Sequence, residues 1–261
     1  MKLRGSAETP SAPAGRHRTR VVAVAGAKGS PGCTFLAVGL ARCLAEHGLQ
    51  VVLVDADAEE PGVAAALALR GGGGTGLAEA ATLGLNADIL GDACVDAGTR
   101  LRVLELAGQG PFEAVGALTL DGRDVVATAR DICAAVVVDL GHAWGPLQRQ
   151  LAAAADWLLW VLIPNRLGVE RADRALGGLA LGTSRGLVVN RASRWSLGGA
   201  ERTLIERHQV PLVARLPEHR RSAHAVSERS RAAHRQRPFG RGLRLVARTV
   251  HPDLDGGGAW P

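Results

Sequence analysis

A short loop near the start of the chain carries the residues with the clearest chemical meaning. The segment AKGSPGCTF, residues 27 to 35, follows an apolar run and precedes a stretch with helical spacing. Phosphate binds well where a strand turns through glycines into a helix, because free backbone N–H groups and the helix dipole point at the anion. Gly29 and Gly32 allow the close turn, and the hydroxyl of Thr34 is a ligand for Mg²⁺. The loop therefore predicts a phosphate site.

One position in this loop departs from the usual phosphate-binding pattern. Such loops end in Gly-Lys-Ser/Thr, whereas this one ends in Gly32, Cys33 and Thr34. The lysine charge on the β and γ phosphates is therefore missing, and losing one preorganised donor costs roughly 3 kcal/mol, about a hundredfold in rate. Pro31 also removes a backbone donor, while Lys28 restores positive charge earlier in the loop. We expect hydrolysis to be weak or absent.

The residue types leave two interpretations of Cys33 open. A thiol at a helix N-terminus near Lys28 has a lowered pKa and is sensitive to oxidation. Alternatively, a small residue is tolerated once the lysine is lost, and we favour this second interpretation. Across the chain the cysteines form no CxxC pair and no metal-ligand spacing with histidine, so we expect reduced thiols rather than disulfides or zinc. They are Cys33, Cys43, Cys94 and Cys133.

The segments around the loop follow the pattern of an α/β protein. From Arg20 onward, short apolar runs alternate with Ala- and Leu-rich helical stretches. The runs are apolar throughout, as parallel strands are when helices cover both faces of their sheet. We expect three layers, α/β/α, with a mostly parallel central sheet. Its predicted strands lie at residues 21–26, 51–55, 134–140, 157–163, 186–190 and 211–216.

Length and composition bound the domain organisation. The 261 residues are 47% hydrophobic, which is enough for one domain with a sizeable core. Residues 1–19 combine Pro, Ser, Gly and basic residues without periodicity and are expected to form a disordered basic tail. Residues 20–250 are expected to form the domain, and residues 251–261 a flexible tail. No segment has the length of a membrane span or the apolar core of a secretion signal, so we expect a cytoplasmic protein.

The loop and several later segments together resemble one family. KGSPGCT resembles the deviant Walker A motif, KGGxGK[ST], of the MinD/ParA family of P-loop ATPases, with Lys28 at the family's signature lysine. VVLVDADAEEPG (51–62) resembles the second strand and switch I, and AVVVDLG (135–141) resembles Walker B. GLVVNR (186–191) and VPLVARLPEHRR (210–221) resemble two later strand ends of the family. The match follows the order of the family's motifs and covers most of the chain.

The resemblance implies a nucleotide site and a role for each matched residue. It implies that ATP or ADP binds with Mg²⁺, that Lys28 reaches a partner's phosphates across an ATP-sandwiched dimer, and that Asp57 positions the attacking water. The residue types alone leave other roles open, since such carboxylates also cap helices and Asn190 also suits a turn. The implied metal contacts are Thr34, Asp55 and Asp139, and the implied nucleotide contacts are Gly29, Gly32, Cys33, Thr34, Phe35, Asn190 at the adenine and Pro217 by the base.

Departures from the family motif resemble one branch of it. The missing in-line lysine, the DLG after the Walker B strand and LRVLELAGQGP (101–111) are similar to CpaE/TadZ proteins, atypical members linked to Flp/Tad pilus assembly and to polar or septal placement. The resemblance implies a homodimer on nucleotide binding that acts as a localisation or assembly factor. Its partners would belong to a pilus, secretion or septum machine. The protein itself would lie peripherally at the membrane, the pole or the septum. A pseudo-ATPase scaffold and a ParA-like partition factor with nonspecific DNA binding are the alternatives.

The last part of the chain is rich in arginine. Nine arginines stand against one acid, Glu228, between Arg220 and Arg248. This excess favours contact with DNA or with an anionic membrane, and a solvated arginine-rich face is the simpler alternative. Apolar residues within the same segment share one side of an expected helix and are candidates for membrane contact. They are Phe239, Leu243, Val246 and Val250.

Overall fold

The structure is a computed structural model that describes most of the chain. It covers residues 18–27, 31–69, 74–106, 120–142, 144–178, 182–192, 198–218 and 237–256. Two of the predicted site residues, Lys28 and Gly29, lie outside the described residues. Most of the arginine-rich segment, residues 219–236, lies outside them as well.

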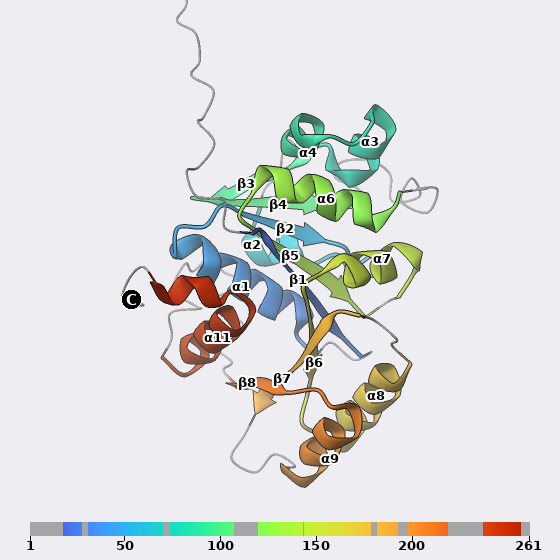
Figure 1. The fold of residues 1–261 in the computed structure, drawn as a ribbon, viewed down its shortest axis with the longest axis vertical. Coiled ribbons are helices and arrows are strands. Elements are labelled where there is room, and N and C mark those ends of the chain that lie inside the picture. Colours follow the sequence, from blue (N-terminus) through green and yellow to red (C-terminus); the bar gives the residue numbers. More distant parts are fainter. Residues whose placement is uncertain are drawn as a thin grey trace, which may run out of the picture.

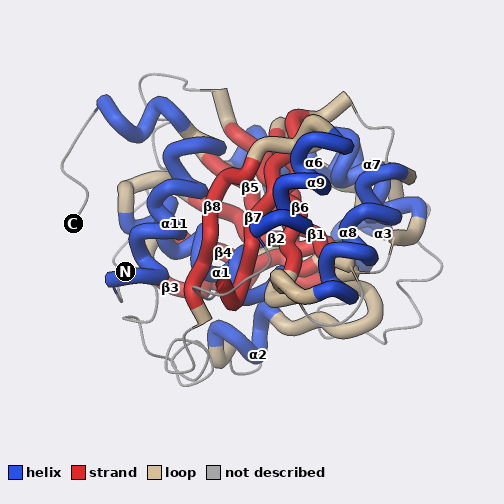
Figure 2. The backbone as a smooth tube through the Cα atoms, turned by 90° about the horizontal axis from the view of Figure 1, so that it is seen from below, coloured by secondary structure: helices blue, strands red, loops and turns tan. Residues whose placement is uncertain are grey.

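An eight-stranded sheet forms the middle layer of the described part of the chain (Figures 1 and 2). Its order is β3-β4-β2-β5-β1-β6-β7-β8, and every pair is parallel except β3 with β4. The predicted α/β class and all six predicted strands are confirmed. The strands are β1 (Arg20–Gly26), β2 (Val51–Asp55), β3 (Val95–Gly98), β4 (Leu101–Glu105), β5 (Ala135–Gly141), β6 (Trp157–Leu162), β7 (Ser184–Ala192) and β8 (Leu212–Pro217).

Helices cover both faces of the sheet, which explains why its strands are apolar throughout. Along β1, Val22 and Val24 join one buried cluster while Val21 and Ala23 join the other, because successive side chains point to opposite faces. The helices α1 (Cys33–Glu46), α2 (Val63–Leu67) and α11 (Arg237–Val250) pack on one face. On the other lie α3 (Gly76–Leu83), α4 (Ala87–Ala93), α6 (Gly122–Ile132), α7 (Pro146–Ala154), α8 (Arg166–Gly177) and α9 (Gly198–His208).

Helix α11 buries the apolar stripe that the sequence analysis considers a candidate for membrane contact. It packs beside α1 and against β8, as Figure 1 shows. The approach to α1 is close, because a Cβ on Gly39 would lie 3.0 Å from Leu243 Cδ1. The membrane interpretation of this stripe is wrong, since its side chains form part of the core, and no described helix is long and apolar enough to span a bilayer. Phe239, Leu243, Val246 and Val250 are each at most 1% exposed.

The described part of the chain extends slightly beyond the expected domain at both ends. At the C-terminal side a short 3₁₀ helix, η2 (Pro252–Gly256), follows α11. His251 is buried, and Leu254 packs against the core. At the N-terminal side Arg18 and Thr19 contact the body of the domain. Folded structure therefore begins before Arg20 and includes the first residues of the expected C-terminal tail.

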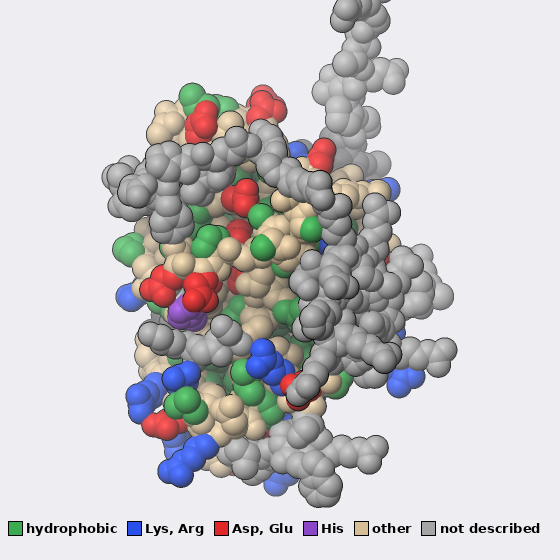
Figure 3. All heavy atoms as spheres, turned by 180° about the vertical axis from the view of Figure 1, so that it is seen from behind, with side chains coloured by type: hydrophobic (Ala, Val, Ile, Leu, Met, Phe, Trp, Pro, Cys, Tyr) green, Lys and Arg blue, Asp and Glu red, His purple; other side chains and the backbone are tan. Residues whose placement is uncertain are grey.

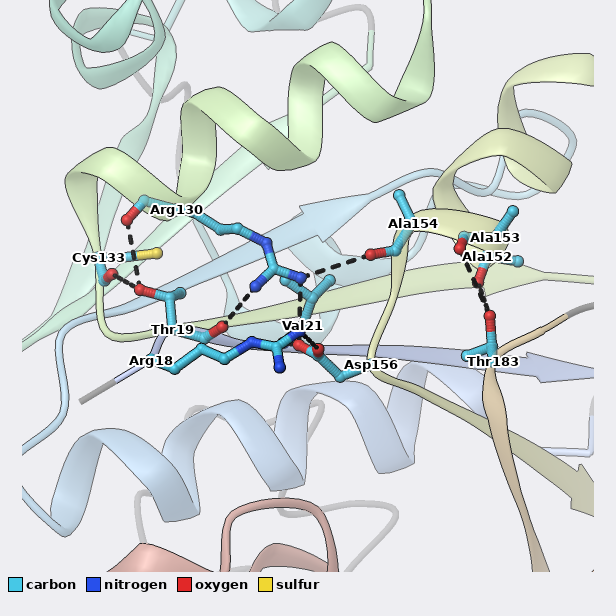
Figure 4. Close-up of polar contacts among 10 residues, drawn as sticks. All are labelled: Arg18, Thr19, Val21, Arg130, Cys133, Ala152, Ala153, Ala154, Asp156 and Thr183. Carbon is cyan, nitrogen blue, oxygen red and sulfur yellow. Dashed lines mark hydrogen bonds and ion pairs between the residues drawn. The ribbon is translucent and has the colours of Figure 1, made fainter. Parts of the chain in front are cut away.

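A polar cluster fastens the start of β1 at the edge of the sheet opposite the strand ends that carry the predicted site (Figure 4). The carboxylate of Asp156 accepts hydrogen bonds from the Val21 N–H at 2.8 Å and from Arg130 Nη2 at 3.2 Å. Arg130 also donates to the Thr19 carbonyl oxygen at 2.8 Å, and the Thr19 hydroxyl donates to the Cys133 carbonyl oxygen at 2.9 Å. This cluster ties the first strand to α6 and to the entry of β6.

Charge is unevenly distributed over the face of the molecule behind the view of Figure 1. Acidic side chains gather in its upper part, at the end that carries α3 and α4, and Lys and Arg side chains gather in its lower part, near α8 and α9 (Figure 3).

Candidate functional site

The carboxyl ends of the parallel strands bring the predicted site residues together. Asp55 at the end of β2 is in register with Asp139 of β5, and β5 pairs with β1 on its other side. The loop after β1 opens into α1, and β7 ends with Asn190 and two further residues. In open parallel sheets ligands bind at this edge.

The start of α1 is free to bind an anion. Gly32 precedes the helix with φ of 97° and offers no side-chain cap, and the first turn contains no acidic residue. The first N–H groups of such a helix need a partner from outside. A Cβ on Gly32 would lie 2.3 Å from Asn190 Nδ2, so glycine is required at this position for both its backbone angle and the available space.

Cys33 occupies the position of the missing lysine with a buried, neutral side chain. It is 5% exposed, and a Cβ on Gly26 would lie 2.7 Å from its sulfur. Burial raises the pKa of the Cys33 thiol well above its ordinary value, and the carboxylates of Asp139 and Asp57 raise it further. The interpretation of Cys33 as an acidic, oxidation-sensitive thiol is therefore wrong, because desolvation and negative charge outweigh the helix N-terminus.

Asp139 is fully buried beside Thr34. Its Oδ1 accepts a hydrogen bond from the Gly141 N–H at 3.1 Å, whereas its Oδ2 has no partner among the described residues. Burial raises the pKa of Asp139 to about 6, against the opposing effects of the Thr34 hydroxyl and the Gly141 N–H. The Thr34 hydroxyl therefore lies close to the Asp139 carboxylate.

Asp57 lies against the glycine of the DLG segment. Its Oδ1 accepts hydrogen bonds from the N–H groups of Glu59 and Glu60, both at 3.1 Å. A Cβ on Gly141, where φ is 60°, would lie 1.9 Å from Asp57 Oδ2. Gly141, at the end of β5, therefore provides the space that the carboxylate of Asp57 occupies.

Asp55 points to a helix rather than to open space. Its Oδ2 accepts a hydrogen bond from the Val63 N–H at 3.0 Å, at the start of α2, and the residue is 1% exposed. Burial raises the pKa of Asp55 to about 7, and the charge of Asp139 contributes to the same shift. Asp55 therefore fixes α2 beside the site, and its position near the metal's water shell stays a prediction.

The remaining predicted contacts lie around the same edge. Asn190 is buried, and its Nδ2 donates a hydrogen bond to the Pro31 carbonyl oxygen at 2.8 Å. Pro217 ends β8 in register with Ala192. The ring of Phe35 packs at a tilt against the ring of Phe239 of α11, with centroids 4.6 Å apart. The contacts of Asn190 and Pro217 with a base stay predictions.

A cavity of about 300 Å³ brings together five of the predicted residues, whereas Asp55, Asp139, Asn190 and Pro217 are not among its described lining residues. Among its lining residues, Arg191, Glu60 and His142 were not predicted as site residues. Arg191 directly follows Asn190 in the matched segment, and this adjacency is the signal that could have identified it. His142 pairs with Glu59 at 3.2 Å. The predicted residues in the lining are Gly32, Cys33, Thr34, Phe35 and Asp57.

The donors present fit a hydrated magnesium ion better than a fully protein-ligated metal. No group of three or more His, Cys, Asp or Glu side chains in the described ranges is arranged to hold a metal. Mg²⁺ usually keeps several waters and takes one or two protein ligands. The unpartnered Oδ2 of Asp139 and the nearby Thr34 hydroxyl meet that need. Thr34 would bind the ion, and Asp139 would hold one of its waters.

Comparison with known families agrees with this arrangement. The model of the CobQ/CobB/MinD/ParA nucleotide binding domain, CbiA, matches residues 22–231. The chain belongs to this family. No curated protein sequence matches the chain closely enough to be counted as a relative. Membership in the family makes a nucleotide the expected ligand of the cavity at the start of α1.

Solved structures of the CobQ/CobB/MinD/ParA family share the fold over nearly their whole length. The septum site-determining protein MinD with Mg-ADP from Pyrococcus horikoshii OT3 has a TM-score of 0.73 at 18% identity, covering 91% of this chain and 98% of that one. A ParA family ATPase from Chlorobium tepidum TLS gives 0.74 at 17%, covering 90% and 98%. The MinC:MinD complex of Aquifex aeolicus gives 0.71 at 18%, covering 92% and 97%. At these identities the likeness establishes the fold.

Proposed function

We propose that the protein binds ATP with Mg²⁺, hydrolyses it weakly or not at all, and acts as a nucleotide-dependent homodimer in localisation or assembly. One observation carries the proposal. Thr34, in the first turn of α1, lies near the buried Asp139, whose Oδ2 lacks a partner among the described residues. This arrangement offers backbone N–H groups to phosphates and oxygen donors to a hydrated Mg²⁺.

Weak hydrolysis follows from the charge of the loop. Cys33 is neutral and buried where the usual motif places a lysine. Without that donor the transition state loses roughly 3 kcal/mol of stabilisation, about a hundredfold in rate. Asp57 lines the cavity, and we propose that it positions the attacking water. The backbone N–H groups therefore still bind the phosphates, while hydrolysis is slow. A long-lived nucleotide-bound state suits a switch that partner proteins recognise.

The dimer and the CpaE/TadZ-like role rest on the sequence resemblance. Lys28 occupies the position of the family's signature lysine, so we propose that it contacts the phosphates of the partner subunit. The DLG segment resembles that branch, and its Gly141 provides the space that Asp57 occupies. We propose partners in a pilus, secretion or septum machine, as in that branch. One of the MinD structures of similar fold is a complex with MinC.

Calorimetry with ATP and ADP, with and without Mg²⁺, tests nucleotide binding. We expect wild type to bind ATP more tightly with Mg²⁺ than without, and Thr34→Ala to lose most of that difference because the hydroxyl is the proposed ligand. Lys28→Ala should weaken binding and dimer formation together, as seen by light scattering. Absence of binding by wild type at millimolar ATP would refute the proposal.

A pseudo-ATPase scaffold is the second candidate, and a different observation favours it. The Asn190 amide bonds to the Pro31 carbonyl oxygen, and the Cys33 sulfur lies against Gly26 at the end of β1, so the loop is held by the protein's own side chains. A scaffold of this kind gives no calorimetric signal with nucleotide. Its localisation in cells is also unchanged by Asp57→Ala, whereas a nucleotide-dependent factor loses its localisation.

Nonspecific DNA binding, as in a ParA-like partition factor, is the third candidate. Arg241 and Arg248 lie exposed on the outer side of α11, whose inner side is buried. Binding through such a face falls steeply with salt, because phosphate contacts release counterions. The double charge reversal Arg241→Glu with Arg248→Glu should abolish duplex binding if this face is responsible.

A further inference from the structure

We propose that Arg191 supplies the positive charge that faces the phosphates of a bound nucleotide, in place of the lysine absent at position 33. The inference rests on the proposed function and names a residue that determines affinity at the same site. It is carried by the position of Arg191 in the cavity, by its backbone conformation and by the charges around it.

The side chain lies where a phosphate-binding cation is needed. Arg191 lines the cavity together with Gly32, Cys33 and Thr34, the residues that open α1. It lies near the end of β7, directly after Asn190, whose side chain bonds to Pro31 in the loop before α1. Among the described lining residues it is the only lysine or arginine. Arginine presents its donors in a planar fork that matches phosphate oxygens.

The backbone of Arg191 has an uncommon conformation, which fixes the direction in which the side chain leaves the end of β7. Its φ is 54°, in the left-handed region that long side chains rarely adopt. The Asn190 Oδ1 accepts a hydrogen bond from the Arg191 N–H at 2.9 Å, and the same amide donates to Pro31. Strained conformations that persist in this way concentrate at functional sites. Asn190 therefore couples the position of Arg191 to the loop that would receive the phosphates.

The charges around the cavity require a cation. Its acidic lining residues are Asp57 and Glu60, and His142 lies beside them. A triphosphate facing two carboxylates is repelled unless positive charge or metal compensates. The guanidinium of Arg191 is exposed and makes no hydrogen bond or ion pair with other described residues. It is therefore available to a ligand.

The test is calorimetry with Mg-ATP on the full chain at low and high NaCl. Arg191→Gln removes the charge and keeps most of the length, and Arg191→Lys keeps the charge. We expect Arg191→Gln to weaken Mg-ATP binding by about tenfold to a hundredfold, the range for a charge-assisted hydrogen bond, and to flatten its salt dependence. Arg191→Lys should retain more affinity than Arg191→Gln. Arg185→Gln, at the opposite end of β7, is the matched control and should bind as wild type does.

The outcomes separate this inference from the function on which it rests. If wild type binds no Mg-ATP, the proposed function itself fails. If wild type binds and Arg191→Gln binds equally well, only the role of Arg191 is refuted. Equal losses in Arg191→Lys and Arg191→Gln would also refute it, because the contact would then not depend on charge. Circular dichroism and the melting temperature without ligand establish that each variant is folded.

Discussion

The side-chain amide of Asn190 donates a hydrogen bond to the carbonyl oxygen of Pro31 over 2.8 Å. The contact joins the end of β7 to the loop after β1, although the two residues are far apart in sequence. Both are buried, so the bond sits in a place where an unpaired polar group is costly. The geometry of the predicted phosphate loop therefore depends on a residue that the loop sequence does not contain.

Asn190→Ala should destabilise the protein by about 1–3 kcal/mol, because it leaves the buried Pro31 carbonyl oxygen unpaired. Chemical denaturation of the ligand-free protein measures the effect. Gln209→Ala is a suitable control, since its side chain is exposed and bonds only to the carbonyl oxygen of Glu206 nearby. Equal stabilities of Asn190→Ala and Gln209→Ala would show that the loop does not need this bond.

Gly141→Ala should be more destabilising than Gly48→Ala, although both glycines have positive φ. A Cβ on Gly48 meets nothing within 4 Å, so that change costs only the left-handed strain of roughly 1–2 kcal/mol. A Cβ on Gly141 collides with the carboxylate of Asp57, which adds about 1–3 kcal/mol of overpacking.

Chemical denaturation of the two glycine variants separates these contributions, and calorimetry shows whether displacing Asp57 also changes Mg-ATP binding. We expect Gly141→Ala to impair binding and Gly48→Ala to leave it unchanged. If Gly141→Ala and Gly48→Ala lost the same free energy of unfolding, the close contact between Asp57 and Gly141 would be contradicted.

Sequence patterns predicted the layers and most strands of this fold, because a strand with apolar side chains on both faces must be covered by other elements on both faces. They also located the loop, Thr34 and the three aspartates at one edge of the sheet. They missed two neighbouring strands: β4, in which Arg102 and Glu105 interrupt the apolar run, and the edge strand β3, whose four residues, VDAG, include only one large apolar side chain. Short edge strands are defined by their pairing with a neighbour rather than by their own composition.

Tertiary contacts decided the features that the sequence left open. The stripe on α11 has the same helical spacing whether it faces lipid or core, and only the packing on β8 and α1 distinguishes the two. The state of Cys33 depended likewise on burial and on Asp57 and Asp139, which come from distant segments. Arg191 was overlooked because a basic residue after a strand is common, and its meaning comes from the cavity it lines.

The stability of the ligand-free protein should fall as pH rises from about 4 to about 7. Burial raises the pKa of Asp55 from 3.8 to about 7 and that of Asp139 to about 6, so the folded state binds more protons than the unfolded state in this range. Stability from these groups is therefore fully present below their unfolded pKa values and is lost as pH rises through the folded ones.

Asp55→Asn isolates the larger of these two shifts, because an amide has no charge to bury and its oxygen still accepts from the Val63 N–H. We expect the variant to show a flatter stability profile between pH 4 and 7 and to exceed wild type at pH 8 by on the order of a few kcal/mol. Denaturation at a series of pH values measures both profiles. Parallel profiles for wild type and variant would mean that Asp55 does not titrate in this range.

Arg130→Ala should destabilise the protein without changing nucleotide binding, since its contacts (Figure 4) lie at the start of β1 and the cavity lies beyond the end of that strand. The change removes the bonds to the Thr19 carbonyl oxygen and to Asp156. We expect the free energy of unfolding to fall by about 1–3 kcal/mol, because these partners are partly buried.

Arg123→Ala, exposed on the same helix, is the control and should change stability by less than about 0.5 kcal/mol. Chemical denaturation compares the two variants, and calorimetry with Mg-ATP verifies that the site is intact. A loss of ATP binding in Arg130→Ala at full stability would place the residue in communication with the site and contradict a purely structural role.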